Sequence, residues 1–111
     1  MGTFKLSKDR YSEFHFNLLA GNGEIILTSE AYGRKDNALN GIESVKINSK
    51  HPERFEKRDS KDGKLYFVLK AENGQIVGTS QMYALEASRE KGIEAVMKNG
   101  PRAEMEKEVE E

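Results

Sequence analysis

The sequence contains the same pattern twice, and residue i of the first copy matches residue i+51 of the second without a gap. Of the 46 aligned pairs between residues 4–49 and 55–100, 15 are identical, where composition alone would give roughly three. With 111 residues in all, each copy is near the lower limit for independent folding. We therefore expect a single domain made of two repeats, 4–49 and 55–100, with a connector at 50–54 and an acidic tail or final edge strand at 101–111.

Each repeat is expected to begin with three strands. Residues 14–20 alternate between two faces, with Phe16 and Leu18 on one face and His15 on the other, which is typical of a half-buried strand. The expected strands of both repeats are 4–8, 14–20, 25–28, 54–60, 65–71 and 76–79.

The turns between these strands are predicted from glycine. Asn22-Gly23 predicts a two-residue type I′ turn, because both central residues of that turn need positive φ. Such a turn would place Ala20 opposite Ile25 in the first repeat. Asp62-Gly63 predicts another tight turn, whereas residues 9–13 lack a glycine and predict a looser loop.

The hydrophobic period then changes to that of a helix in both repeats. The expected buried positions, spaced by three or four residues, are Ala38, Gly41, Ile42 and Val45, then Leu85, Ser88, Gly92, Ile93 and Val96. The entry residues Gly33 and Ala84 are weak N-caps. A glycine in mid-helix costs about 1 kcal/mol relative to alanine, so Gly41 and Gly92 indicate a close approach of helix to sheet. The repeats thus predict an α+β fold of tandem β-β-β-α units, with one antiparallel sheet and two helices.

Four segments resemble the YegP-like family of small bacterial proteins of unknown function. They are Gly-Asn-Gly-Glu-Ile-Ile-Leu-Thr-Ser-Glu-Ala-Tyr (21–32), Asn-Gly-Ile-Glu-Ser-Val-Lys-Ile-Asn (40–48), Ala-Glu-Asn-Gly-Gln-Ile-Val-Gly-Thr-Ser-Gln-Met-Tyr (71–83) and Gly-Ile-Glu-Ala-Val (92–96). The resemblance implies units of three strands, a helix and a further strand, which combine into one sheet and exchange their C-terminal strands. In this chain it makes residues 53–60 the linking strand and 104–109 its counterpart.

Composition restricts the possible functions. The chain has no cysteine, which excludes disulfides, thiolate metal sites and a cysteine nucleophile. It shows no signal peptide and no apolar run long enough for a membrane span, so we expect a cytoplasmic protein without membrane contact. The net charge of −1 makes nucleic acid an unfavourable partner, although residues 46–64 carry seven Lys or Arg against four acids.

No residue set predicts catalysis, a cofactor or a metal. His15 and His51 have no histidine at the matching position of the other repeat, and Lys61 stands where a calcium loop around Asp59 and Asp62 would need an oxygen ligand. Ser29 and Ser80 are shared, but neither has a shared base beside it apart from the glutamates 43 and 94. We expect these serines to bond the backbone at the corner between strand and helix, with Tyr32 and Tyr83 packed over it.

The sheet face away from the helices is the best candidate for function. It is expected to be open and unusually apolar, which would suit a protein partner or a homodimer. The candidate contact residues are His15, Leu19, Ile26, Tyr66, Val68 and Val77. The leading hypothesis is a non-enzymatic interaction module, and the alternative is single-stranded nucleic-acid binding through residues 46–64 and this face.

Overall fold

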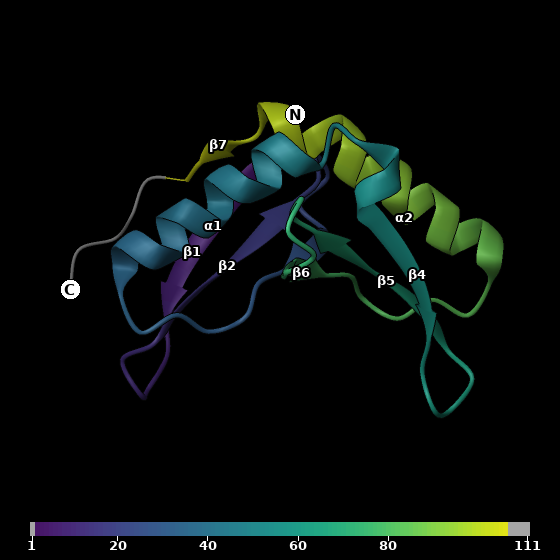
Figure 1. Ribbon diagram of the computed structural model, residues 1–111, viewed down its shortest axis with the longest axis horizontal. Coiled ribbons are helices and arrows are strands. Elements are labelled where there is room, and N and C mark those ends of the chain that lie inside the picture. Colours follow the sequence, from purple (N-terminus) through teal and green to yellow (C-terminus); the bar gives the residue numbers. More distant parts are fainter. Residues whose placement is uncertain (1, 107–111) are drawn as a thin grey trace.

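A computed structural model describes residues 2–106 of the chain. Each repeat forms three strands and a helix, and a short strand follows the second helix (Figure 1). The elements are β1 (Thr3–Lys8), β2 (Phe14–Leu19), β3 (Ile25–Thr28), α1 (Lys35–Asn48), the 3-10 turn η1 (Pro52–Arg54), β4 (Phe55–Asp59), β5 (Leu65–Lys70), β6 (Ile76–Thr79), α2 (Glu86–Asn99), the 3-10 turn η2 (Gly100–Arg102) and β7 (Glu104–Met105).

The strands of both repeats join one sheet in the order β4-β5-β6-β3-β2-β1-β7. The repeats meet where β3 and β6 pair antiparallel at Thr28 and Thr79. The expected α+β fold is confirmed, with one correction: β7 pairs parallel to β1, so the sheet is mixed. Figure 1 shows both helices on the same side of the sheet, which leaves the other side without a helix.

The C-terminal strands are exchanged between the halves. The chain leaves α1 and enters β4, which pairs with β5 of the second repeat. It leaves α2 and enters β7, which pairs with β1 of the first repeat. The expected final edge strand is therefore present at Glu104–Met105, while residues 107–109 of the expected strand lie outside the described residues.

The helices bury the glycine-containing faces that the sequence predicts, except at one end of α2. Ala38, Gly41, Ile42 and Val45 of α1 are buried, as are Gly92, Ile93 and Val96 of α2. Leu85 is 64% exposed because α2 begins one residue later than expected, which makes Leu85 its N-cap. Arg89 is buried instead, at the position equivalent to Ala38. Arg34 and Leu85 are the N-caps, and neither makes a side-chain capping bond.

The hairpin turns are one residue longer than predicted. Gly23 donates its N–H to the carbonyl of Ala20 at 2.9 Å, and only Gly23 of this turn has positive φ, at 88°. This is a type I turn closed by a glycine in the left-handed region, not a type I′ turn. The extra residue is accommodated by an irregularity between Leu18 and Leu19, so Leu19 and not Ala20 pairs with Ile25, while Leu18 pairs with Leu27. Gly74 and Gly63 close the same turn in the other two glycine hairpins, with φ of 90° and 86°.

The loop at 9–13 is not looser than the others, contrary to prediction. Ser12 donates to the Asp9 carbonyl at 3.0 Å and has a φ of 63°, so a serine occupies the position that Gly63 holds in the second repeat. The Asp9 carboxylate accepts the N–H groups of Tyr11 and Glu13 at 2.9 and 3.0 Å. These bonds inside the turn offset the left-handed backbone of a residue with a Cβ.

The helix glycines make room for tyrosine rings. A Cβ placed on Gly41 would lie 2.5 Å from the Tyr32 hydroxyl, and one on Gly92 would lie 2.6 Å from Cζ of Tyr83. Each tyrosine stacks on a core phenylalanine, with centroids 6.3 Å and 6.4 Å apart and planes within 9° and 10°. The close approach is therefore between helix and tyrosine, and the tyrosine fills the corner after β3 or β6.

Equivalent positions complement one another where the repeats meet. Leu27 is fully buried, and a Cβ on Gly78, its equivalent in the second repeat, would lie 2.5 Å from its Cδ2 atom. The fully buried Ser49 likewise occupies the space beside Gly100, its own equivalent. One repeat thus supplies a side chain where the other supplies a glycine. Close packing across this junction needs both members of each pair.

Candidate functional site

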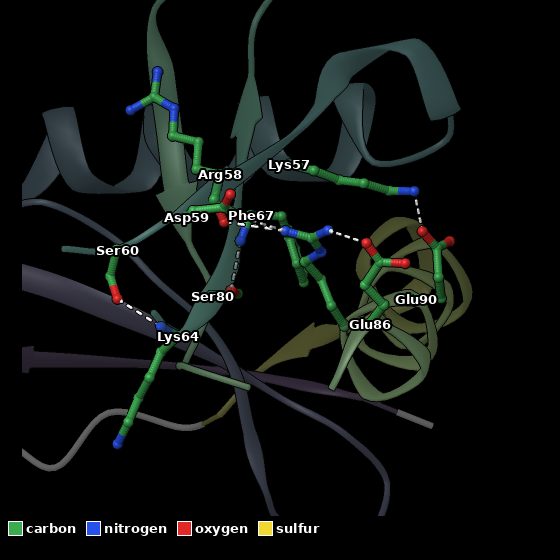
Figure 2. A network of polar contacts seen from close by, with 10 residues as sticks. Lys57, Arg58, Asp59, Ser60, Lys64, Phe67, Ser80, Glu86 and Glu90 are labelled. Atoms are coloured by element: carbon green, nitrogen blue, oxygen red, sulfur yellow. Dashed lines mark hydrogen bonds and ion pairs between the residues drawn. The ribbon is translucent and has the colours of Figure 1, made fainter. Parts of the chain in front are cut away.

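The shared serines are bound by the backbone on both sides. The Ser29 hydroxyl accepts the Phe16 N–H at 2.9 Å and donates to the Glu30 carbonyl at 2.7 Å. Ser80 repeats the arrangement: it accepts the Phe67 N–H at 3.0 Å (Figure 2) and donates to the Gln81 carbonyl at 2.7 Å. These bonds replace sheet and turn hydrogen bonds at the corner. The expected structural role of both serines is confirmed.

The other titratable groups do not converge. Burial, and next the charge of Glu30, raise the pKa of Tyr32, which keeps its hydroxyl protonated in ordinary conditions. His15 Nε2 lies 3.6 Å from Asp9, and His51 Nδ1 lies 3.6 Å from Glu53. Residues 2–106 hold no group of three or more His, Cys, Asp or Glu arranged for a metal.

The sheet face away from the helices, which we call the helix-free face, is less apolar at its surface than predicted. Ile26, Val68 and Val77 are 4%, 2% and 8% exposed, and Ile26 and Val77 belong to the continuous core. The expectation that these three side chains form an open contact surface was wrong, because the monomer itself buries them. His15, Leu19 and Tyr66, the other three candidates, are half-buried.

The helix-free face differs between the two repeats. In the second repeat Glu56 forms ion pairs with Arg58, at 3.3 Å, and with Lys70. Hydrogen bonds from Lys70 and then Arg58 lower the pKa of Glu56, and Glu56 and then Tyr66 raise the pKa of Arg58. The side chains of this half are therefore tied to one another across β4 and β5.

The first repeat has no such network at the equivalent positions. Lys5, Ser7 and Leu19 stand where Glu56, Arg58 and Lys70 stand in the second repeat. Within residues 2–106, Lys5, Ser7, Asn17 and Thr28 make no side-chain hydrogen bond or ion pair. Lys5 and Thr28 are exposed and Asn17 is half-buried. This half of the helix-free face therefore presents polar groups whose bonding capacity is open.

The structure disperses the basic residues of the 46–64 segment. Lys57 pairs with Glu90 of α2 (Figure 2), and Arg54 donates to the Asn48 side chain. Lys50 instead lines an open groove of about 520 Å³ with Lys98 and Arg102, over Met97 and Pro101. The groove is formed by helix ends and η2, so it is separate from the helix-free face. The connector and that face do not form one continuous basic surface.

Sequence reasoning missed Arg89, which is 6% exposed in α2. Its Nη1 atom donates to the Arg58 carbonyl at 3.0 Å and lies 3.5 Å from Asp59, and its Nη2 atom lies 3.8 Å from Glu86 (Figure 2). The guanidinium therefore ties the start of α2 to the end of β4. The repeat alignment contained a signal, because an arginine opposite Ala38 in a buried helix position needs a partner.

A family described as a domain of unknown function, DUF1508, matches the chain twice, over residues 9–56 and 60–106. The chain belongs to the DUF1508 family. The two matches begin 51 residues apart, which is the repeat period, and this confirms the tandem organisation.

Curated relatives match this chain over nearly its whole length. A UPF0339 protein of Pseudomonas aeruginosa is 54% identical over 100 residues, which cover 90% of this chain and 91% of the relative. The UPF0339 protein YegP of Escherichia coli K12 is 56% identical over 99 residues, which cover 89% of this chain and 90% of the relative. These relatives are bacterial, and their names state no activity.

Solved structures of DUF1508 relatives have the same fold. The solution NMR structure of a UPF0339 protein from Shewanella oneidensis superposes with a TM-score of 0.89 at 51% identity, covering 95% of this chain and 89% of that one. The solution NMR structure of YegP from E. coli, described as a protein of unknown function, also gives a TM-score of 0.89, at 52% identity, covering 95% and 90%. Family membership thus supplies a fold and no reaction.

Among the described residues, no helix is long and apolar enough to cross a membrane.

Proposed function

We propose that this DUF1508 protein is a non-enzymatic interaction module that binds a protein partner through the helix-free face of its first repeat. The observation that carries the proposal is the difference between the two halves of that face. Arg58 and Lys70 both bind Glu56 in the second repeat. Lys5, Asn17 and Thr28 of the first repeat have no side-chain partner within residues 2–106. Accessible polar groups that have no partner within the protein can exchange bonds to water for bonds to a binding partner without first breaking internal ones.

The absence of a catalytic role is part of the same proposal. The shared Ser29 and Ser80 hydroxyls bind backbone groups, and the Tyr32 hydroxyl is packed against Gly41. The remaining shared acids, Glu43 and Glu94, are exposed on the helices. A nucleophile, a base and an oxyanion donor would have to lie within hydrogen-bond reach of one another.

The test is a pair of arginine variants. Asn17→Arg with Thr28→Arg places two bulky charges on the helix-free face, and Asn40→Arg places one on the exposed side of α1 as a control. We expect the double variant to lose the proteins captured by the tagged wild-type chain from a bacterial extract, while Asn40→Arg keeps them. The circular dichroism spectrum should be unchanged for both. Capture of the same proteins by the double variant would exclude this face.

A second candidate function is single-stranded nucleic-acid binding, and one observation favours it. Lys50, Lys98 and Arg102 line one groove and make no ion pair within residues 2–106. Clustered cations of this kind can contact a phosphate backbone. An NMR titration with a short single-stranded oligonucleotide at low salt should move the amides of these three residues. The absence of shifts there would remove this candidate.

A further inference from the structure

The two ends of the sheet are equivalent by the repeat, but only one of them is covered. β1 and β4 occupy matching positions, next to β2 and β5, with Phe4 and Phe55 at equivalent places. β7 pairs with β1 through Thr3–Glu104 and Phe4–Met105. β4 is a terminal strand of the sheet, and no strand formed by residues 2–106 lies on its outer side.

The hydrogen bonds of β7 show which backbone carbonyls of the first repeat bind the added strand. The N–H of Glu104 donates to the Gly2 carbonyl at 3.4 Å, and the N–H of Glu106 donates to the Phe4 carbonyl at 2.8 Å. The residues equivalent to Gly2 and Phe4 are Glu53 and Phe55. Phe55 is the first residue of β4, so its carbonyl is expected to point outward, whereas Glu53 lies in the 3-10 turn η1.

The hairpin after β4 fixes which of its residues face outward. The Ser60 N–H donates across the hairpin to the Lys64 carbonyl at 2.7 Å, so Ser60 faces β5. Successive residues of an edge strand alternate between bonding the neighbouring strand and facing away from it. Phe55, Lys57 and Asp59 thus direct their backbone groups outward. The Phe55 N–H is used by the Pro52 carbonyl, but within residues 2–106 no backbone bond beyond the β4–β5 ladder uses the Lys57 N–H.

The side chains of β4 define what could pair there. On the helix side, Phe55 is half-buried and contacts the core, as Phe4 does beside Met105. Arg58 lies on the helix-free side of the strand, where Glu56 already has two cationic partners. A strand with acidic residues on the helix-free side and an apolar residue on the helix side matches both faces. β7, with Met105 between Glu104 and Glu106, has that pattern.

We propose that the outer edge of β4 is a peptide-binding site, which takes an extended acidic segment of another protein as an added parallel strand. Addition of a strand to an open sheet edge obtains affinity from main-chain hydrogen bonds and specificity from alternating side chains. The charged residues of β4 prevent indiscriminate pairing of this edge. Lys57 is paired with Glu90, and Glu56 is paired with Lys70. These ion pairs hold the two side chains away from the outer edge, so the backbone of β4 stays accessible. The site is distinct from the helix-free face and does not depend on the function proposed for it.

The probe is a synthetic peptide with the sequence of residues 103–111, Ala-Glu-Met-Glu-Lys-Glu-Val-Glu-Glu. It is titrated into the full-length chain, and backbone amide shifts are followed by NMR. We expect shifts concentrated in residues 55–59. Two variants separate backbone pairing from charge: Lys57→Pro removes the outward N–H, and Lys57→Ala keeps it. Both variants lose the ion pair with Glu90, so they form a matched pair.

The expected result is that Lys57→Pro binds the peptide about tenfold more weakly than Lys57→Ala, the value of one hydrogen bond. A peptide with every glutamate replaced by glutamine should also bind more weakly than the acidic peptide. Equal affinity of the two Lys57 variants would overturn the strand-addition site. Equal binding of the glutamine peptide would overturn its preference for acidic segments. Shifts confined to β1 and β7 would show exchange with the chain's own last strand and would likewise exclude a site on β4.

Discussion

The two repeats form the same β-β-β-α unit, but they satisfy their polar groups differently. In the second repeat, Arg89 binds the end of β4 and Glu56 binds Arg58 and Lys70, so charges connect α2, β4 and β5. In the first repeat, Ala38 replaces Arg89 and Lys5 replaces Glu56. Ion pairs and a charged hydrogen bond connect the elements of the second repeat, and the equivalent positions of the first repeat make no such contacts within residues 2–106. A duplicated scaffold can therefore keep one fold while its halves acquire different surfaces.

The repeats also differ where they touch. Leu27 fills the space above Gly78, and Ser49 fills the space beside Gly100. If both positions of a pair carried the larger residue, the two side chains would overlap. If both carried glycine, a void would remain, and voids in a close-packed interior are destabilising. The halves are thus adapted to each other and not to copies of themselves.

The largest effect should come from making the junction symmetric. Gly78→Leu places a second leucine against Leu27, and we expect a loss of about 3 kcal/mol in the free energy of unfolding, from overpacking. Urea denaturation measures the loss. The double variant Leu27→Gly with Gly78→Leu exchanges the two residues and should recover part of the stability. A double variant less stable than Gly78→Leu would show that the complementarity is not the cause.

The next effect tests a feature that both repeats share. Gly92→Ala should improve helix propensity by about 1 kcal/mol but forces the Tyr83 ring to move, for a net loss of roughly 1–2 kcal/mol. Gly41→Ala should cause a similar loss of stability, because the added Cβ would displace the Tyr32 ring. Adding Tyr83→Phe to Gly92→Ala removes the hydroxyl but keeps Cζ, which lies 2.6 Å from the added Cβ, so it should restore only part of the lost stability, as measured by thermal unfolding. If the phenylalanine brings no recovery, the close contact with the tyrosine hydroxyl does not explain the glycine.

Arg89→Ala makes α2 resemble α1 at this position. The variant loses a charged hydrogen bond to the Arg58 carbonyl and leaves a space, so we expect a loss of about 2 kcal/mol in the free energy of unfolding. Hydrogen exchange at the end of β4 should become faster, while exchange at the end of β1 is unchanged. Ala38 has no polar role, so Ala38→Ser is the control and should leave β4 exchange unchanged.

A smaller effect is expected in the hairpins. Ser12→Gly removes a side chain from a left-handed residue and should stabilise the chain by up to about 1 kcal/mol. Gly63→Ser makes the opposite change in the second repeat and should destabilise it by a similar amount. The two unfolding midpoints in urea give the comparison. Shifts of the same sign would refute the equivalence of these turns.

The smallest effect concerns acid stability. The ion pairs of Glu56 lower its pKa below the ordinary value of 4.5. Such a group stabilises the fold above the unfolded-state pKa and loses that contribution as the pH falls through the folded-state pKa. Glu56→Gln does not titrate, so the stability difference from wild type should shrink between about pH 5 and about pH 3. Lys5→Gln in the first repeat should show no such change, and a constant difference for Glu56→Gln would contradict the assignment.

Much of the fold could be predicted because it depends on local patterns. Alternation located β2 and β5, the glycine spacing located the helix faces, and the shared serines were expected to bond the backbone at the corners. The turn type was wrong because Asn-Gly is compatible with two hairpin geometries, and the choice depends on strand register. The loop at 9–13 was misjudged because bonds from Asp9 allow Ser12 to adopt the conformation of a glycine.

The candidate surface was harder to predict for a physical reason. Alternation correctly places Ile26, Val68 and Val77 on the face opposite the helices, but it cannot say how much of that face the fold itself covers. All three are below 10% exposed. Burial is a property of the whole sheet, which includes contacts between segments far apart in the sequence. The same holds for Arg89, whose partners belong to β4.

The sequence by itself determined that the chain has two equivalent units, which side chains form most of their cores and that each helix is closely approached at Gly41 or Gly92. These features follow from residue spacing within one repeat. Tertiary structure decided the details of how the units join: Leu27 over Gly78, the parallel pairing of β7 with β1, and, within residues 2–106, an outer edge of β4 that pairs with no strand. Such contacts connect residues of different repeats, so no periodicity within the chain encodes them.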